Sequence, residues 1–327
     1  MAGDQTPHLP EDAFLAQFLG AMALEFAMRQ GLIDQWASGT PLPKTQSAMV
    51  LRAMLASSGV IDDAGLTPAF RAVLDQRREV LVEKLRFLRL AAKDVVNGLD
   101  HLLTDLPSFM GQSETFALFR YDQAKTTSPE HIAATRPWVT YVTALSRAEA
   151  PVLAPLLPLA GARWLLEIGG NTGVMARAAL DLHPDLQAVI CDLPAVCAIG
   201  EEMNDHPRLA FAPGDARAPD WPDVAGAQPD TVLFKSVLHD WPRKDAEAMI
   251  DRALAHLAPG GRLIICERGA FGQATLPFSM TANLVFAPFY RPPGDYAAAF
   301  AARGMANIAQ VDTMLDMPFH IVSGCKS

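Results

Sequence analysis

The hydrophobic pattern in the second half of the chain predicts a strand, a turn, a helix and another strand in succession. A short apolar run, Trp164–Ile168, is long enough for a buried strand and ends at Gly-Gly-Asn-Thr-Gly, residues 169–173. These residue types tolerate positive φ and allow a ligand to approach the backbone closely. Helical periodicity follows up to Leu182, and a second apolar run, 188–191, ends on Asp192. In open α/β sheets such a unit binds a ligand beyond the carboxyl ends of the strands, where an acid accepts hydrogen bonds from ribose hydroxyls.

The same alternation resumes towards the end of the chain. Apolar runs predict strands at 231–234 and 262–266 around a helix at 245–257, followed by a helix at 296–303 and strands at 307–311 and 319–323. Strands that alternate with helices favour an α/β fold with a mostly parallel, Rossmann-like sheet.

The first third of the chain has helical periodicity instead. Apolar residues recur every four positions within 11–36, on a helical stripe that Gly31 ends. Further helices are expected at 45–58 and 80–106, with a short hairpin or wing between 60 and 68. A stretch at 109–127 looks irregular, and 129–157 is helical. We therefore expect a mainly helical, winged-helix-like domain over residues 1–105 and an α/β domain with lead-in helices over 106–327. Because the segment 11–68 has few basic residues and its helical stripes are rich in Met and Phe, dimerisation is favoured over DNA binding.

Composition narrows the class of protein. The 327 residues are 50% apolar and 19% charged, enough for a proper core, and the net charge of −9 argues against a nucleic-acid partner. The four cysteines form no Cys-x-x-Cys pair, so reduced thiols are expected rather than disulfides or a metal site. The segment Met1–Asp12 lacks the pattern of a signal peptide, and no apolar run reaches the ~18 residues that cross a bilayer. These features predict a cytoplasmic protein without a membrane partner.

The glycine spacing distinguishes between nucleotide cofactors. A nicotinamide dinucleotide fingerprint needs glycine at its first, third and sixth positions. Counted from Gly169, the third position is Asn171 and the sixth is Val174, so the fingerprint is absent here. The pattern Glu167-x-Gly-x-Asn-x-Gly173 instead resembles the first motif of class I S-adenosylmethionine-dependent methyltransferases, with Asn171 in place of the middle glycine. Asn visits the left-handed region readily, so the turn can survive this change.

A downstream motif makes the resemblance specific. Residues 234–241, Phe-Lys-Ser-Val-Leu-His-Asp-Trp, resemble the Leu-Lys-x-x-Leu-His-Asp-Trp signature of the small-molecule O-methyltransferases of plants and of bacterial antibiotic tailoring. Asp192-Leu-Pro194, Gly214-Asp215 and the Ala-Pro-Gly-Gly of 258–261 are similar to that family as well. The resemblance implies a sheet with an antiparallel terminal strand, an N-terminal winged-helix dimerisation domain, a homodimer, S-adenosylmethionine as cofactor with S-adenosylhomocysteine as product, and no metal.

The resemblance also assigns roles by position. His239 is the implied catalytic base, Asp240 a positioning residue, and Glu267 the carboxylate that orients the imidazole. The implied cofactor residues are Glu167, Gly169, Gly170, Gly173, Asp192, Leu193, Gly214, Asp215 and Lys235. This chemistry is reasonable, because methyl transfer needs an aligned acceptor that loses a proton, and a histidine with a pKa of about 6.5 can accept it near neutral pH.

Five aromatic residues are candidates for the wall of an acceptor pocket, although each is also compatible with a plain core position. They are Trp138, Tyr141, Phe286, Phe289 and Tyr290. An apolar, aromatic lining favours a small aromatic or polyketide-like acceptor.

Each implied site residue has a plainer interpretation. His239 fits a structural position, Asp192 fits a cap for the following helix, and Lys235 fits a surface position. Glu267 fits an ion pair with Arg268, and Asp215 fits an ordinary turn.

Two departures from the family pattern leave other functions open. Ala216-Arg217 follows Gly214-Asp215 where an aromatic residue or Met is usual, and the stretch 289–294 lacks the family's second glutamate. The alternatives are a homologue that binds S-adenosylmethionine but hydroxylates, decarboxylates or cyclises its substrate, and a methyltransferase that acts on N or C. A winged-helix regulator is disfavoured by the charge.

Overall fold

This computed structural model describes residues 9–40, 44–270 and 276–327. The chain divides into two compact units, Met1–Leu118 with Gln273–Phe286 and Phe119–Gly272 with Ala287–Ser327. The sequence-based expectation for Met1–Asp12 lies partly outside the described residues. Among the helices of the described ranges, none combines the length and the apolar character needed to cross a membrane.

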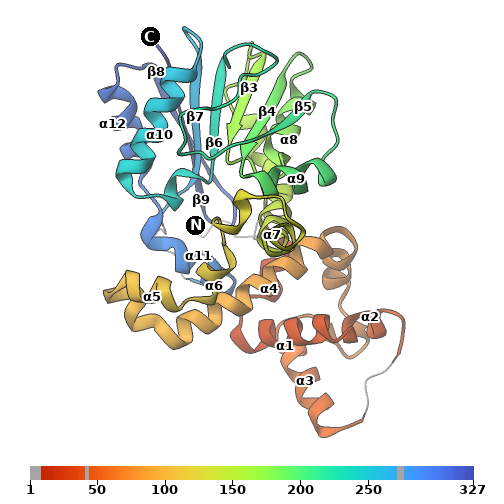
Figure 1. Cartoon of the computed structure of the whole chain (residues 1–327). Helices are drawn as coiled ribbons and strands as arrows, with labels where there is room; N and C mark the ends of the chain where they lie inside the picture. Colours follow the sequence, from red (N-terminus) through yellow and green to blue (C-terminus); the bar gives the residue numbers. More distant parts are fainter. Residues whose placement is uncertain (1–8, 41–43, 271–275) are drawn as a thin grey trace, which may run out of the picture. The chain divides into compact units, whose positions relative to one another are not determined.

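The first unit is helical, as predicted for the N-terminal region (Figure 1). Its elements are η1 (Pro10–Phe14), α1 (Phe18–Arg29), α2 (Leu32–Ala37), α3 (Gln46–Ser57), the hairpin β1 (Ile61–Asp62) and β2 (Gly65–Leu66), α4 (Pro68–Thr104), α5 (Leu106–Gln112), α6 (Glu114–Leu118), η5 (Phe278–Met280) and α11 (Thr281–Phe286). Leu24, Leu55, Phe70 and Leu81 are fully buried in its core.

The helical stripe predicted within 11–36 ends at Gly31 as expected, because Gly31 adopts φ 69° and separates α1 from α2. One local prediction for this unit was wrong. The stretch expected to be irregular contains α5 and α6, and the side chain of Asp105 caps α5 by accepting a hydrogen bond from the Ser108 amide at 3.3 Å.

The second unit is built on a seven-stranded sheet in the order β5-β4-β3-β6-β7-β9-β8. The strands are β3 (Trp164–Ile168), β4 (Gln187–Asp192), β5 (Leu209–Pro213), β6 (Thr231–Lys235), β7 (Arg262–Arg268), β8 (Ala306–Met314) and β9 (Pro318–Cys325). Strands β3 to β7 pair in parallel, whereas β9 is antiparallel to both β7 and β8. The predicted mostly parallel sheet with an antiparallel terminal strand is confirmed.

Helices cover both faces of this sheet (Figure 1). The helices of this unit are η2 (Gln123–Lys125), α7 (Pro129–Leu153), η3 (Ala154–Leu156), α8 (Val174–Leu182), α9 (Pro194–Met203), η4 (Leu238–Asp240), α10 (Arg243–His256), η6 (Ala287–Phe289) and α12 (Pro293–Ala302). Leu166, Phe234 and Ile265 pack against α10 and α12. Because side chains alternate along a strand, Glu167 and Lys235 face the opposite side, which α7, α8 and α9 cover.

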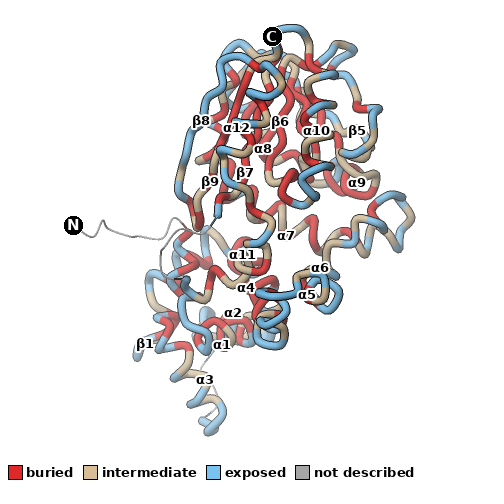
Figure 2. The backbone as a smooth tube through the Cα atoms, turned by 90° about the vertical axis from the view of Figure 1, so that its left-hand side faces the viewer, coloured by how far each residue is buried: buried red, intermediate tan, exposed pale blue. Residues whose placement is uncertain are grey.

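The strand β5 was missing from the sequence-based prediction. It is five residues long and ends in Pro213, and its burial is only partial (Figure 2). A proline and two alanines weaken the strand pattern, but an edge position tolerates them. With β5 in place, five parallel strands direct their carboxyl ends to one edge of the sheet, and the candidate polar residues follow those ends.

Candidate active site

A tight turn lies directly after β3. Gly169, Asn171 and Gly173 adopt φ of 66°, 53° and 72°, and α8 begins at Val174. A Cβ on Gly169 would lie 2.7 Å from the Val237 side chain, so both conformation and space require glycine there. The side chain of Asn171 accepts hydrogen bonds from the Thr172 amide at 2.7 Å and from the Thr143 hydroxyl at 3.1 Å. These contacts explain how Asn replaces a glycine in this turn.

Asp192 lies beside this turn, at the end of β4. Its carboxylate accepts hydrogen bonds from the backbone amides of Asn171 at 2.8 Å and Leu193 at 2.7 Å. Burial raises the pKa of Asp192 to about 6 in spite of these two donors. The amide of Gly214 donates to the Asp192 carbonyl at 2.8 Å and so ties the end of β5 to the end of β4.

Glu167 is the last charged residue of β3 and is almost completely buried. Its carboxylate accepts a hydrogen bond from the Ala176 amide at 3.1 Å, and Gly170 packs directly over its carboxyl carbon. Burial raises the pKa of Glu167 to about 8, although the charge of Lys235 opposes this shift.

The pKa of Glu167 leads to a testable pH dependence. The folded state holds the proton of Glu167 more tightly than the unfolded chain does. The contribution of Glu167 to the free energy of unfolding is therefore fully present below the ordinary pKa of 4.5 and is lost as the pH rises to about 8. A Glu167→Gln variant cannot ionise, so it should match the wild type at pH 5 and exceed its free energy of unfolding by at least about 1 kcal/mol at pH 8. Urea unfolding at both pH values measures this difference, with Glu201→Gln on the exposed side of α9 as control. A constant difference between wild type and Glu167→Gln across this range would contradict it.

Asp215, which follows β5, is surrounded by cations. Its two carboxylate oxygens lie 3.3 Å from Nε and Nη2 of Arg217, and Lys125 Nζ lies 3.6 Å away. Burial alone would raise the pKa of Asp215, but hydrogen bonds from the Arg217 backbone and side chain lower it below its usual range. The Arg217 guanidinium also lies 4.2 Å over the ring of Trp241.

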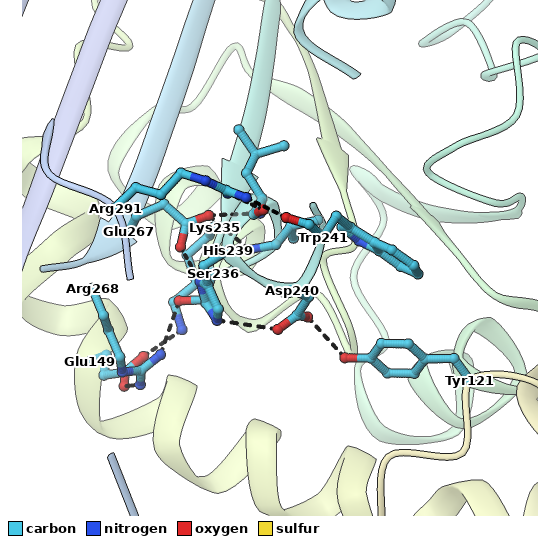
Figure 3. A network of polar contacts seen from close by, with 12 residues as sticks. Tyr121, Glu149, Lys235, Ser236, His239, Asp240, Trp241, Glu267, Arg268 and Arg291 are labelled. Atoms are coloured by element: carbon cyan, nitrogen blue, oxygen red, sulfur yellow. Dashed lines mark hydrogen bonds and ion pairs between the residues drawn. The ribbon is translucent and has the colours of Figure 1, made fainter. Parts of the chain in front are cut away.

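His239 lies between two carboxylates in the segment after β6 (Figure 3). Its Nδ1 is hydrogen-bonded to Glu267 Oε2, and its Nε2 is 3.3 Å from Asp240 Oδ1. Because an ionised carboxylate only accepts, Nδ1 is the donor to Glu267 and Nε2 is the nitrogen that can take a proton. Burial alone would lower the pKa of His239, but the charges of Glu267 and Asp240 raise it above its ordinary value.

Glu267 is itself firmly held. Its Oε1 accepts hydrogen bonds from the backbone amides of Val237 at 3.0 Å and Leu238 at 2.8 Å. Burial would raise its pKa, but the pairing with His239 and these two amides lower it. A carboxylate fixed in this way holds the imidazole in one orientation, as in triad chemistry.

Tyr121 completes the arrangement from a segment that precedes α7. Its hydroxyl donates to Asp240 Oδ2 at 2.9 Å, and its ring centroid lies 5.4 Å from that of Trp138 and 6.1 Å from that of Trp241. Each oxygen of Asp240 therefore has a neighbour, one on Tyr121 and the other on His239.

Lys235 and Arg268 share one buried carboxylate, that of Glu149 on α7 (Figure 3). Lys235 Nζ also donates to Ser146 Oγ at 3.2 Å, and Arg268 Nη1 donates to Ser236 Oγ at 3.0 Å. The ammonium of Lys235 is thus engaged inside the protein, so its contact with a cofactor stays a prediction. The alternative that Lys235 is a surface lysine is wrong, because this residue is only 8% exposed.

The stretch 289–295 contributes an aromatic ring to His239 rather than a carboxylate. The ring of Tyr290 meets the imidazole edge-on, with 5.5 Å between the centroids. Arg291 donates to the carbonyls of Leu238 and Trp241, and Asp295 is paired with Arg243. The carboxylate neighbours of His239 that the structure describes are therefore Glu267 and Asp240.

The five candidate pocket aromatics are divided between the two units. Trp138, Tyr141 and Tyr290 are buried in the second unit, and Phe289 is half-buried there. The indole nitrogen of Trp138 has no hydrogen-bond partner among the described residues. Phe286 belongs to the first unit, where it stacks on Phe87 with 6.2 Å between the centroids.

Three participants were not recognised from the sequence: Tyr121, Glu149 and Arg217. Glu149 carried the clearest signal, since it is an acid between Ala148 and Ala150 within an apolar helical stretch. No grouping of three or more His, Cys, Asp or Glu residues suited to a metal ion occurs in the described ranges.

Part of the chain is similar in sequence to known O-methyltransferases. Residues 126–282 match the family model described as O-methyltransferase domain. The chain is 38% identical over 117 residues to demethylspheroidene O-methyltransferase of Rhodobacter capsulatus. The aligned stretch covers 36% of this chain and 28% of that protein. The chain is 30% identical over 115 residues to 3-hydroxy-5-methyl-1-naphthoate 3-O-methyltransferase of Streptomyces sahachiroi. This alignment covers 35% of this chain and 33% of that protein.

Solved structures show the same fold over most of the chain. The mitomycin 7-O-methyltransferase MmcR is 21% identical, with a TM-score of 0.69 and 94% of both chains covered. Human N-acetylserotonin methyltransferase, solved in complex with S-adenosylmethionine, is 14% identical, with a TM-score of 0.69 and 94% of both chains covered.

Proposed function

Because residues 126–282 carry an O-methyltransferase domain, we propose that this chain transfers a methyl group from S-adenosylmethionine to a hydroxyl of a small aromatic or polyketide-like acceptor. The observation that carries the proposal is the buried pair of His239 and Glu267, with Glu267 fixed by two backbone amides. A histidine held in this way has one nitrogen oriented by a carboxylate and the other available as a base.

The residues at the carboxyl ends of β3, β4 and β5 fit the cofactor. The glycine turn gives access to backbone at Gly169, Gly170 and Gly173, and Asp192 beside it provides an acid for ribose hydroxyls. Glu167 would hold the amino group of the methionine part, and Asp215 the adenine amino group. Leu193, Gly214 and Lys235 complete the proposed cofactor site. The relatives described as O-methyltransferases, and the neighbour solved with S-adenosylmethionine, support the choice of cofactor.

The residues of this chain would act on the acceptor proton. When bound, S-adenosylmethionine supplies a methyl group on a positively charged sulfur, which is already a good leaving group. His239 Nε2 would accept the proton of the acceptor hydroxyl while the oxygen of that hydroxyl takes up the methyl group. Glu267 would stabilise the imidazolium, and Asp240 would position the hydroxyl. General base catalysis of this kind contributes about 10²- to 10⁴-fold, and alignment can contribute more.

The acceptor pocket is proposed to be lined by Trp138, Tyr141, Phe289 and Tyr290, all of which belong to the second unit. Buried aromatic rings near His239, such as Tyr290, support an apolar and planar acceptor. One of the relatives is described by its name as a methyltransferase of a hydroxylated naphthoate.

The function is tested by incubating the purified chain with S-adenosylmethionine and a panel of phenols, naphthols and hydroxyquinones. We expect S-adenosylhomocysteine and a methyl ether to form in equal amounts with at least one acceptor class. A chain that does not bind S-adenosylmethionine at all would overturn the proposal.

A second candidate function is favoured by the stretch 289–295, which directs Tyr290 rather than a carboxylate at His239. A homologue that binds S-adenosylmethionine but hydroxylates, decarboxylates or cyclises its substrate would keep the cofactor site and change the acceptor side. Methylation of N or C is a related alternative. Tight binding of S-adenosylmethionine without S-adenosylhomocysteine from any acceptor would favour the non-methylating function.

We further propose a homodimer formed through residues 1–105, with residues 106–327 as the catalytic domain. Apolar side chains are exposed on α1, α3 and α4: Phe18, Leu19, Met49, Val50, Val96, Leu99 and Leu103. Val96, Leu99 and Leu103 recur at helical spacing on α4, as expected for a face that packs against another helix. The free cysteines, three of them buried, suit a reducing cytoplasm.

Charge on this α4 face should weaken the dimer. Leu103 is 71% exposed, and a Leu103→Asp variant should raise the dimer dissociation constant at least about tenfold, since a buried leucine contributes about 1.5–3 kcal/mol. Sedimentation velocity over a range of concentrations measures the shift. Leu182→Asp, an exposed leucine on α8, is the control and should leave the dimer intact. A wild type that is monomeric at all concentrations would contradict the dimer.

A further inference from the structure

The contact between Arg217 and Trp241 joins two distant strands. Arg217 follows β5, whereas Trp241 follows β6, and two other strands, β4 and β3, lie between them in the sheet. Neighbouring strands are about 4.8 Å apart, so these two strand ends are separated by about 14 Å. The stacked pair of Arg217 and Trp241, 4.2 Å apart, therefore spans the carboxyl ends of β3 and β4, where the glycine turn and Asp192 lie.

This position matches the base of a bound nucleoside. If Asp192 at the end of β4 holds the ribose, the base extends towards the neighbouring strand β5 and so towards Asp215 and Arg217. A purine ring needs a flat partner for its face, and a guanidinium plane serves as well as an aromatic ring. The Arg217 side chain is still 41% exposed, so it has surface left for such a contact.

Three contacts fix the position and orientation of the Arg217 guanidinium. The Trp241 ring covers one face, and the two oxygens of Asp215 meet its edge at 3.3 Å each. The Arg217 amide also donates to Asp215 Oδ1 at 2.9 Å, which keeps backbone and side chain on the same carboxylate. A pre-ordered guanidinium loses little freedom when a ligand stacks on it.

We propose that Arg217 is the residue that stacks on the adenine ring of the cofactor, with Trp241 supporting it from behind. This inference rests on the proposed function. It assigns a role to the position where Arg217 stands and links the adenine site to the segment that holds His239 and Asp240.

Calorimetric titration with S-adenosylhomocysteine and, separately, with adenosine tests the assignment through three variants. Arg217→Phe keeps a flat surface and should bind both probes within about threefold of the wild type. Arg217→Lys keeps the charge beside Asp215 but loses the plane, and Arg217→Ala loses both, so each should weaken binding about tenfold, the size expected for loss of base stacking. Arg163→Ala is the matched control, since Arg163 stacks on Trp164 at 4.9 Å at the other end of β3 and should not affect binding.

The outcomes separate the possibilities. Full binding by Arg217→Lys with loss in Arg217→Phe would mean that Arg217 acts through charge alone and would overturn the stacking role. Equal binding by wild type and Arg217→Ala would also overturn it, while leaving the proposed function intact. A wild type that binds neither probe would overturn the proposed function and this assignment with it. Thermal melting of each variant checks that it is folded.

Discussion

Replacing His239 with glutamine is expected to lower the rate of methyl transfer about 10²- to 10⁴-fold while leaving the affinity for S-adenosylhomocysteine unchanged. Glutamine is polar and similar in size, but it cannot take a proton from the acceptor hydroxyl. His239 is hydrogen-bonded to Glu267 through Nδ1, so the loss concerns the base and its orientation rather than the glycine turn. Single-turnover rates and calorimetric titration measure the two quantities separately.

Glu267→Gln provides the matched comparison, because Glu267 acts through His239. The rate loss of the double variant should be close to that of His239→Gln alone, since residues that work as a unit are not additive. In the wild type, the rate should rise with pH through the raised pKa of His239, because only the neutral imidazole is a base. Undiminished turnover by His239→Gln would remove His239 from the mechanism.

Replacing Glu149 with alanine is expected to destabilise the second unit by about 3–5 kcal/mol, because it leaves the buried cations Lys235 and Arg268 without their shared carboxylate. Urea unfolding followed by tryptophan fluorescence measures the loss. Four of the five tryptophans lie in the second unit, so the signal reports mainly on that unit.

A control and a rescue make this prediction specific. Glu202 pairs with Arg136 on the surface, and Glu202→Ala should cost at most about 1 kcal/mol. Replacing Glu149, Lys235 and Arg268 together by methionine should recover much of the lost stability, because apolar side chains can replace a buried ion cluster. A loss for Glu149→Ala no larger than that for Glu202→Ala would show that the cluster is hydrated.

Features that depend on neighbouring residues were predictable from the sequence. The strand at Trp164–Ile168 and the turn after it follow from an apolar run and from residues that accept positive φ. The pairing of His239 with Glu267 was expected from the resemblance, and the parallel register of β6 and β7 explains it, because both residues follow or end neighbouring strands.

Features that depend on packing between distant segments were not predictable in this way. Tyr121 reaches Asp240 across 119 positions, and Glu149 reaches Arg268 across the same separation. Neither pair has a local pattern, because Tyr121 meets Asp240 only when the segment before α7 packs beside η4, and Glu149 meets Arg268 only when α7 packs beside the end of β7. The strand β5 was missed for a different reason, since its edge position accepts a composition that does not resemble a buried strand.

The antiparallel insertion of β9 has a consequence for synthesis of the chain. Glu267 in β7 pairs with His320 in β9, so the strand that carries the orienting carboxylate acquires its second neighbour late. About 57 residues separate the end of β7 from the end of β9, which at roughly 5–20 residues per second takes about 3–11 s of translation. During this interval β7 is an open, apolar strand edge on the ribosome, the kind of edge that aggregates most readily. Slower translation between these two strands should therefore lower the soluble yield in cells.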